Sequence, residues 1–551
     1  MSARLLLLIL FTWPLCAVAQ DATDTLASPV PYCKIPPPVL PDSLPTTGVD
    51  SVAGPSMSHA DSVFALYDAD AYRQPILYPH RDTTWYNFST GGRVHLQVLN
   101  RTTDTLRYVR RSVTAPVLEA LGINFGVWGY DYLTGREWAK VTANTISRNV
   151  RHNFVLDCDS YSGNQFSHPY HGSMFYNAAR YHGHSYYTAA LYPLIGSAVW
   201  EYFCETNLPS YNDFLSTGIG GTAIGEVTHR TSDLVFDNSK TGFGRAVREI
   251  VGTALNPARG VHRLFSGEMW RFSSDRGKIE TPQPFSLNVS LGTRHIKETR
   301  HLHRSRDIAY VDLLLVYGDH FWLNKDPKPF DFFTLHMLLN TSPNNPTFSD
   351  VDIRGRILGV QYEGVRQWKV DLGIYQNFRY VDNYGSKDEE RAGDFAMFCE
   401  AASFGIGCYT AKVGRLFTFS NETSLNGIIF GAVANDTYFA RRYNYASGFS
   451  VRNDMRLSLN RRITLGEEFY LARLFTPKGP EDPTTQHSSY DWGEKGQVTV
   501  MQLRFFAHVN LRRDLYAGTS FSLFQRRANY AYSPDVHAHS NELTFSVTYS
   551  I

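Results

Sequence analysis

Cysteine is scarce in this sequence of 551 residues, and charge of neither sign dominates. Lys and Arg number 53 against 52 Asp and Glu, so the chain has no overall field to attract nucleic acid, and we expect no such partner. The 6 cysteines are scattered, and five remain if Cys16 is removed with a leader, so the sequence predicts neither a disulfide framework nor a CxxC metal site. These five are Cys33, Cys158, Cys204, Cys399 and Cys408.

Hydropathy is low as well, with a mean of −0.28, although aromatic residues are abundant. They make up 14% of the chain, including 33 Tyr and 35 Phe. This combination is typical of a membrane β-barrel. Each strand of such a barrel exposes only every second residue to lipid, whereas aromatic belts mark both membrane interfaces.

The N-terminus has the pattern of a secretory signal peptide. Arg4 precedes an apolar stretch that is too short to remain as a membrane span, and Ala17 and Ala19 fit a cleavage site after Ala19. Attachment of lipid at Cys16 is the alternative, but Trp13-Pro14-Leu15 before it lacks the small residue that this modification needs. Export places the protein in a Gram-negative envelope. We expect it in the outer membrane, with its N-terminal part in the periplasm.

Three regions are predicted before the barrel. Residues 20–60 are rich in Pro, Ser and Thr and indicate an extended periplasmic linker. Residues 61–114 contain two weakly alternating stretches that favour an extended segment or a hairpin. Residues 115–275 carry Ala, Leu, Gly and Trp at helical spacing and predict a compact, mainly helical domain. Within this domain Pro209-Ser210 precedes a helix start, and Gly218, Gly221, Thr222 and Gly225 form a smooth stripe suited to tight packing.

From residue 280 to 551 the hydrophobic period becomes two, which predicts an antiparallel transmembrane β-barrel of about 12 strands. Apolar residues alternate with charged ones, as Met455 does with Asp454 and Arg456, so we expect charged side chains to face the lumen. The last alternating strand ends at Ile551 and is the segment that barrel-assembly machinery typically recognises. The predicted fold is therefore an α+β membrane protein, with a helical domain ahead of a C-terminal barrel. Its expected partners are this machinery, outer-membrane lipid and lipopolysaccharide.

A group of histidines near the start of the helical domain is the first candidate site. His168 and His171 are three residues apart and can share a helical face, where they could bind a metal or act as a base, with Ser167 or Ser173 as nucleophile. The alternative is a structural role at a helix start, which we favour because HxxH lacks the Glu of HExxH. Pro169 predicts an extended backbone at His168, with the pair on either side of a turn.

Two carboxylates on one helical face form the second candidate site. Glu201 and Glu205 repel each other, so a cation, a shared proton or a metal is expected between them. The candidate cations are Arg180, Arg230 and Arg245, and a structural ion-pair network is the preferred interpretation. Four further polar residues complete the set. Asp213 suits a helix N-terminus, Glu226 can pair with Arg230 at i+4, and Asn164 and Asn212 are candidates for binding or structural roles.

Several short motifs in this region occur in one order. They are Asp157-Cys158-Asp159, Asn164, Phe166 to Gly172, Ala179-Arg180, Gly196-Ser197, Trp200-Glu201-Tyr202, Glu205, Pro209 to Asp213, Gly220-Gly221 and Gly225-Glu226. Over about residues 115–275 they resemble the bacterial family called domain of unknown function 3943. The resemblance implies an envelope protein whose helical domain accompanies an outer-membrane barrel. The family has no established activity, so it implies no catalytic residue.

Two classes of function follow from the sequence. The first is non-enzymatic: a barrel with a helical plug or periplasmic cap, acting in envelope architecture, transport or partner binding. The second is a hydrolase or transferase acting on lipid or lipopolysaccharide, with His168 or His171 as base and Glu201, Glu205 or Asp213 as orienting carboxylate. The patterns predict no cofactor and no bound metal, and whether catalysis occurs stays open.

Overall fold

In a computed structural model, the structure describes residues 112–551 and two short strands, β1 (Trp85–Tyr86) and β2 (Arg93–Val94), which pair antiparallel. The signal peptide at 1–19, the linker at 20–60 and most of the segment at 61–114 lie outside the described residues. The gaps within the described part are residues 275, 281–282, 299–304, 322–327, 343–344, 364–367, 384–395, 414–416, 436–440, 461, 482–490 and 513.

Helices occupy the region between 114 and 265, and several of them begin at polar capping side chains. The hydroxyl of Ser210 accepts a hydrogen bond from the backbone N–H of Asp213, and the Asn256 side chain does the same for Arg259. The elements are α4 (Thr114–Leu133), η1 (Glu137–Ala139), α5 (Ala143–Arg151), η2 (Gly163–Ser167), α6 (His168–Arg180), α7 (Tyr186–Ala189), α8 (Leu191–Phe203), α9 (Tyr211–Leu215), η3 (Ser216–Gly220), α10 (Gly221–Val235), α11 (Gly242–Leu255) and α12 (Pro257–Phe265). The helix start predicted after Pro209-Ser210 is confirmed.

Helices α6 and α10 pack against each other so closely that only glycine fits at their contact. A Cβ atom on Gly221 would lie 2.7 Å from the Cα of Gly172, and one on Gly225 would lie 2.6 Å from the Tyr176 ring. The tight packing predicted for the small-residue stripe is therefore confirmed. Each of these helices follows a π-helical turn, η2 or η3.

Twelve antiparallel strands form a closed barrel in which every neighbour in sequence is a neighbour in space and β14 returns to β3. The predicted barrel and its strand number are confirmed. The strands are β3 (Phe285–Glu298), β4 (Ser305–Tyr317), β5 (Phe333–Asn340), β6 (Phe348–Glu363), β7 (Trp368–Asp382), β8 (Met397–Val413), β9 (Phe417–Ala434), β10 (Tyr443–Leu459), β11 (Ile463–Thr476), β12 (Gly496–Arg512), β13 (Leu515–Tyr530) and β14 (Val536–Ser550).

Charged side chains fill much of the lumen, as the alternation predicts. Arg452 of β10 bonds to Asp352 of β6 at 2.7 Å, although β7, β8 and β9 lie between these two strands in the barrel. Arg379 of β7 reaches Gln502 of β12 at 2.8 Å. Such bonds between strands that are not neighbours cross the barrel interior, and they identify which face of each strand points inward. The remaining space is a cavity of about 320 Å³.

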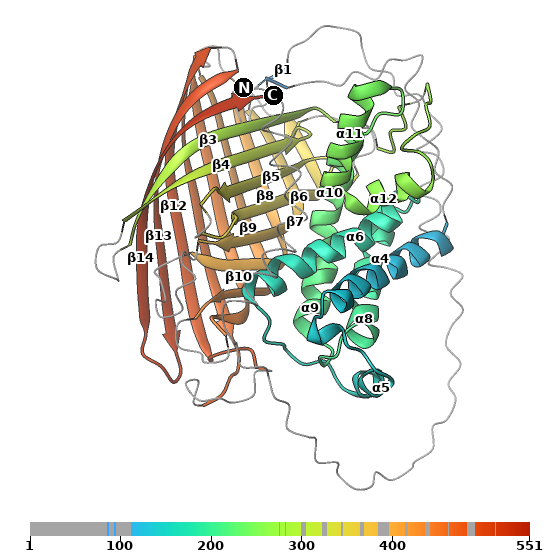
Figure 1. Ribbon diagram of the computed structural model, residues 1–551. Coiled ribbons are helices and arrows are strands. Elements are labelled where there is room, and N and C mark those ends of the chain that lie inside the picture. The colour runs from blue at the N-terminus through green and yellow to red at the C-terminus, as the bar shows by residue number, and fades with distance from the viewer. Residues whose placement is uncertain are drawn as a thin grey trace.

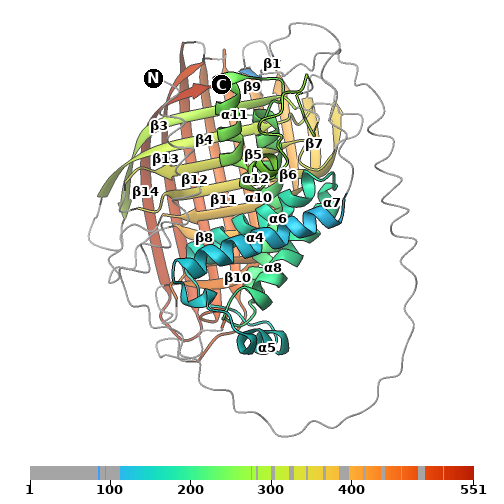
Figure 2. The same ribbon diagram turned by 45° about the vertical axis from the view of Figure 1, so that its right-hand side comes forward.

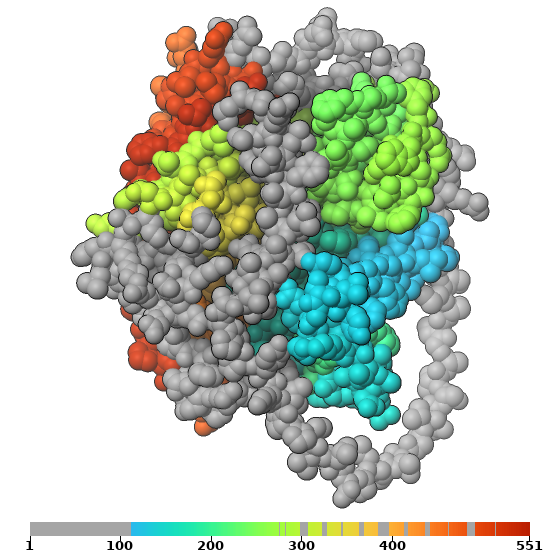
Figure 3. Space-filling view, in the orientation of Figure 1, coloured from blue at the N-terminus to red at the C-terminus, as the bar shows by residue number. Residues whose placement is uncertain are grey.

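The outward faces of the strands are exposed over part of the barrel and covered by helices over the rest. Around much of the barrel they expose large apolar side chains, among them Ile406, Phe449 and Phe545. Over part of the length of β4 to β10 they pack instead against the helices, and the outward residues Phe333, Val351 and others share one hydrophobic core with helical residues. Figures 1 and 2 both place the helices on one flank of the barrel, and Figure 3 shows them, blue to green, beside the strands.

None of the described helices lines the lumen cavity, so the structure gives no support to the helical plug predicted from the sequence. The residues that line the lumen cavity all come from strands and their connections, because the helices meet the outward side chains instead. Register shifts in β7 and β8 lie where η3 approaches these strands: a Cβ on Gly220 would lie 2.8 Å from the carbonyl oxygen of Ala401 and 3.2 Å from the Phe378 ring. Among the described residues, we find no helix whose length and apolarity would let it cross a membrane.

Candidate functional site: a buried acidic cluster at the barrel wall

The candidate residues from the sequence gather mainly in one place, where η2, α6, α8 and α9 meet the outer face of β10. Asp157 lies at the centre of this acidic cluster. Its Oδ1 atom accepts hydrogen bonds from the side-chain amides of Asn164 at 2.7 Å and Asn212 at 2.9 Å. Asn164 and Asn212 are both fully buried. The cluster therefore joins the segment before η2 to α9.

Two tyrosines of β10 complete the cluster from the barrel side. The Asn164 amide donates to the hydroxyl groups of Tyr443 at 2.8 Å and Tyr445 at 2.6 Å, and the Tyr445 hydroxyl donates to Oδ1 of Asp157 at 2.9 Å. The Arg441 guanidinium, just before β10, donates to the backbone oxygen of Asp157 at 2.9 Å and lies over the Tyr445 ring. Polar contacts across this interface therefore attach the helical domain to the wall.

Glu201 and Glu205 belong to the same cluster, and the arginines predicted to compensate them do not approach. The Glu201 carboxylate accepts a hydrogen bond from the backbone N–H of Ser210 at 2.6 Å, and that of Glu205 accepts one from the Trp200 indole at 3.2 Å. Burial, followed by the charge of Glu205, raises the pKa of Glu201 well above its usual range. Burial and the charge of Asp157 raise the pKa of Glu205 to about 8. A retained proton, rather than a cation, therefore relieves the repulsion.

Asp213 and His168 form the edge of the cluster. Asp213 accepts hydrogen bonds from the Ser210 hydroxyl and from the Asn212 amide, the latter at 3.0 Å, while Nε2 of His168 lies 3.4 Å from its Oδ1. Burial and the charge of Asp157 raise the pKa of Asp213 well above its usual range. Burial lowers the pKa of His168, so this pair is neutral near pH 7.

The two histidines do not share a ligand position. His171 packs against Phe175 and Trp200, with ring centroids 4.6 and 5.1 Å away, and burial lowers its pKa to about 3. The turn predicted at Pro169 is wrong, because His168 has helical dihedral angles and α6 runs through both histidines. The π turn η2 directly before α6 widens the helix where a proline ring would otherwise meet an earlier carbonyl.

The arginines form separate ion-pair networks. Arg180 and Arg230 both bond to Glu226, each with an Nε–oxygen distance of 2.7 Å, and Arg180 also reaches Glu280 at 2.7 Å. Burial opposes ionisation of Glu226, but these two charges outweigh it and hold its pKa at about 2. The prediction that they compensate Glu201 and Glu205 is thus wrong, whereas the i+4 pairing of Glu226 with Arg230 is confirmed. Arg245 pairs with Glu249 at 2.7 Å.

Arg230 also connects this network to the barrel. Its guanidinium donates to Asp331 at 2.9 Å and to the backbone oxygen of Pro329 at 2.7 Å, both in the connection between β4 and β5. Sequence patterns missed Asp331, Glu280, Tyr443 and Tyr445 as functional partners. No local spacing could indicate them, because each meets a residue at least a hundred positions away or on another element.

The arrangement of these side chains favours a structural role, in which they hold the helices against the barrel wall, over a catalytic one. Glu201 and Asp213 are almost completely buried, and each bonds to protein groups that fix its position. Glu205 is 8% exposed, and burial raises its pKa far enough that it carries little charge at neutral pH. A general base needs access to a substrate proton, and these carboxyl groups are buried.

Residues 153–258 match the family model described as Domain of unknown function (DUF3943). This segment contains the four carboxylates of the acidic cluster, Asp157, Glu201, Glu205 and Asp213, and also Glu226. No curated protein matches the chain significantly.

Solved structures similar to the chain are barrels and cover about half of it. A NanC porin is 11% identical, with a TM-score of 0.25, over 46% of this chain and 98% of its own. The COG4313 outer membrane channel from Pseudomonas putida F1 is 7% identical, with a TM-score of 0.25, over 49% and 97%. The outer membrane channel DcaP of Acinetobacter baumannii is 7% identical, with a TM-score of 0.21, over 48% and 96%.

Proposed function

We propose that this protein is a non-enzymatic component of the outer membrane, in which the barrel anchors a helical domain within the lipid layer beside it. The observation that carries the proposal is the shared hydrophobic core between the helices and the outward faces of β4 to β10. Those faces are where lipid contacts a membrane barrel. The helices therefore occupy positions that lipid would otherwise fill, and the assembly acts in envelope architecture and partner binding.

The polarity of the helical domain supports a lipid environment. Its interior holds charged residues such as Glu226, Arg230 and Arg263, each no more than 1% exposed. Its surface carries large apolar side chains, including Phe125 and Ile195, which are 56% and 57% exposed. On the surface of a water-soluble protein, extended apolar patches are rare.

The strand connections favour one orientation. Connections at the end of the barrel that holds the C-terminus are mostly short, such as 414–416 and 460–462, whereas the other end has the longer segments 383–396 and 477–495. Outer-membrane barrels place short turns in the periplasm and long loops outside. The chain enters β3 from the helical domain at the short-turn end, so the residues that lead into β3 are on the periplasmic side in this orientation.

Photocrosslinking in cells tests the lipid placement. With p-benzoylphenylalanine at Phe125 or Ile195 we expect lipid or lipopolysaccharide adducts, as at Phe545 on the barrel belt, which is 57% exposed. Glu137 is the matched control, because its side chain is 55% exposed but polar and its position should stay in water. Adducts at Phe545 alone would overturn the placement, since all of the other positions would then face water.

Transport through the lumen is a second candidate function, favoured by the charged cavity of about 320 Å³. The bond between Arg379 and Gln502 crosses this space at 2.8 Å, so passage would be restricted to small polar solutes. Planar-bilayer recordings distinguish the two functions. An architectural barrel should give almost no conductance in the wild type, whereas a channel should conduct measurably and respond to R379A. The lipid hydrolase or transferase alternative gains no support, because the buried carboxyl groups bond to protein groups.

A further inference from the structure

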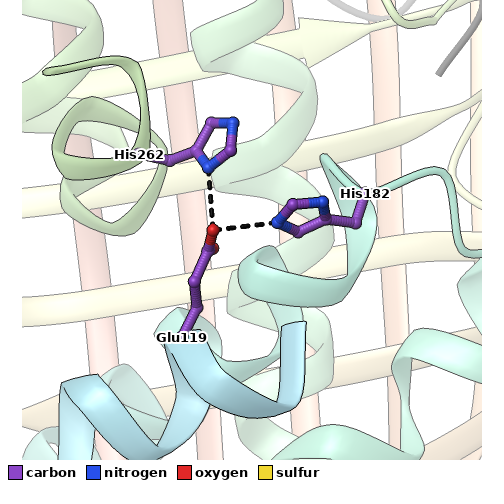
Figure 4. Close-up of side chains that lie close together, drawn as sticks. All are labelled: Glu119, His182 and His262. Atoms are coloured by element: carbon purple, nitrogen blue, oxygen red, sulfur yellow. Dashed lines mark hydrogen bonds and ion pairs between the residues drawn. The ribbon is translucent and has the colours of Figure 1, made fainter. Parts of the chain in front are cut away.

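Glu119, His182 and His262 meet on the side of the helical domain away from the acidic cluster. Glu119 lies in the second turn of α4, His182 in the turn after α6, and His262 in the last turn of α12. Oε1 of Glu119 lies 2.9 Å from Nε2 of His182 and 2.8 Å from Nδ1 of His262. Figure 4 shows the carboxylate pointing between the two rings. Segments far apart in sequence therefore bring two imidazoles and one carboxylate to a single point.

The donor set is one that first-row divalent cations bind. One atom from each of the three residues lies within 4.8 Å of the other two. Zinc takes imidazole nitrogen and carboxylate oxygen at about 2.0 to 2.2 Å, so ligand atoms around it stand roughly 3.3 Å apart. The distances from Oε1 of Glu119 to the two histidine nitrogens therefore need to increase by only about 0.5 Å to admit the ion.

The surroundings prepare the carboxylate for this role. The Tyr181 hydroxyl donates to the second oxygen of Glu119, which fixes the orientation of the carboxylate as outer hydrogen bonds do in metal sites. The side chains of His182, His262 and Glu119 are 14%, 21% and 30% exposed, so an ion can reach them from solvent.

We propose that Glu119, His182 and His262 form a binding site for a zinc-like divalent cation. The ion replaces the two hydrogen bonds: each ring moves its proton to the nitrogen that faces away and presents a lone pair to the metal. Three protein ligands leave a fourth position open to water, as in zinc sites that are not purely structural. The ion also fastens α4, the first helix of the domain, to α12, the last.

Metal titration of the purified full chain in detergent tests the site. We expect Co²⁺ to bind at one equivalent, with the visible absorption of a tetrahedral ion, and Zn²⁺ to displace it. H182Q and H262Q should each weaken binding by at least about tenfold. H152Q is the matched control, because His152 directly follows α5 and its ring bonds to the neighbouring backbone oxygen of Asn153, so this variant should bind as the wild type does.

A variant that preserves the fold separates metal loss from misfolding. E119Q keeps the shape of the side chain and can still accept hydrogen bonds, so its circular dichroism and gel mobility should match the wild type while Co²⁺ affinity falls. The proposal is overturned if the wild type binds Co²⁺ and Zn²⁺ no more tightly than H182Q. It is equally overturned if H262Q and E119Q bind Co²⁺ as tightly as the wild type does, since binding would then occur elsewhere.

Discussion

The side-chain amide of Asn164 donates to the hydroxyl of Tyr445 across the boundary between the helical domain and the barrel, with a nitrogen–oxygen distance of 2.6 Å. Both residues are fully buried. A buried amide that loses its partners carries the full cost of desolvation, so this contact allows one relative position of helices and wall and penalises others. Apolar packing alone is less selective, because it depends mainly on area.

Replacing Asn164 should therefore loosen the helical domain without unfolding the barrel. We expect N164A to lower the free energy of opening of α6 by about 2 kcal/mol, because the hydroxyl groups of Tyr443 and Tyr445 lose the amide that donates to them inside the interface. Hydrogen–deuterium exchange of α6 measures this. N207A is the control, since Asn207 is exposed in the same domain. Combining N164A with Y445F should cost less than the sum of the two changes. Full additivity would show that the two residues do not interact.

Replacing Arg230 should cost more stability than replacing Asn164. R230M removes the charge that faces both Glu226 and Asp331 and leaves two buried carboxylates short of a partner. Breaking a buried ion pair in this way typically costs about 3 to 5 kcal/mol. We expect the variant to be degraded in cells or to lose the gel mobility of the folded form. R151M should behave as the wild type, because Arg151 is exposed at the end of α5.

The barrel was predictable from sequence because each strand separates two environments. Residues such as Met455 and Arg456 alternate because one faces lipid and the next faces a charged lumen, and this period is visible without knowing any partner. The acidic cluster was predictable only in part. The sequence shows that Glu201 and Glu205 would repel each other. It does not show what relieves this repulsion, because that depends on neighbours that no local pattern reveals. Asn164 and Tyr445, for example, are 281 positions apart.

Stability of the helical domain should depend on pH through Glu205. Its pKa is about 8 in the fold and near 4.5 when unfolded, so the folded state holds the extra proton between these values. The folded state is therefore favoured at low pH, and its stability falls as pH rises from about 5 through 8, by up to a few kcal/mol. Thermal melting of the helical signal at pH 5.5 and 8.5 measures this. E205Q cannot ionise at this position, so its melting temperature should differ less between pH 5.5 and pH 8.5 than that of the wild type does. An equal or larger difference would assign the effect to another group.

The contact between α6 and α10 gives the last prediction. In G221A the new methyl group would lie 2.7 Å from the Cα of Gly172, which is backbone and cannot rotate away, so the two helices must separate. Both helices also contact the wall, so this separation should weaken the attachment as well as the packing. We expect a loss of about 2 kcal/mol or more in the unfolding free energy of the helical domain.

G122A is the matched control for this change. Gly122 lies in the middle of α4 with no atom within 4 Å of the added Cβ, so alanine there should stabilise the helix by about 0.5 to 1 kcal/mol. Opposite signs from the same substitution would show that close approach, and not helix propensity, is what requires glycine at Gly221. If G221A were as stable as the wild type, α6 and α10 would have room to move apart. The rigid attachment of the helices to the barrel would then lose its main support. Directly before α6, the backbone oxygen of Gln165 accepts from the Cys399 thiol of β8, and Arg230 of α10 bonds to Asp331 between β4 and β5.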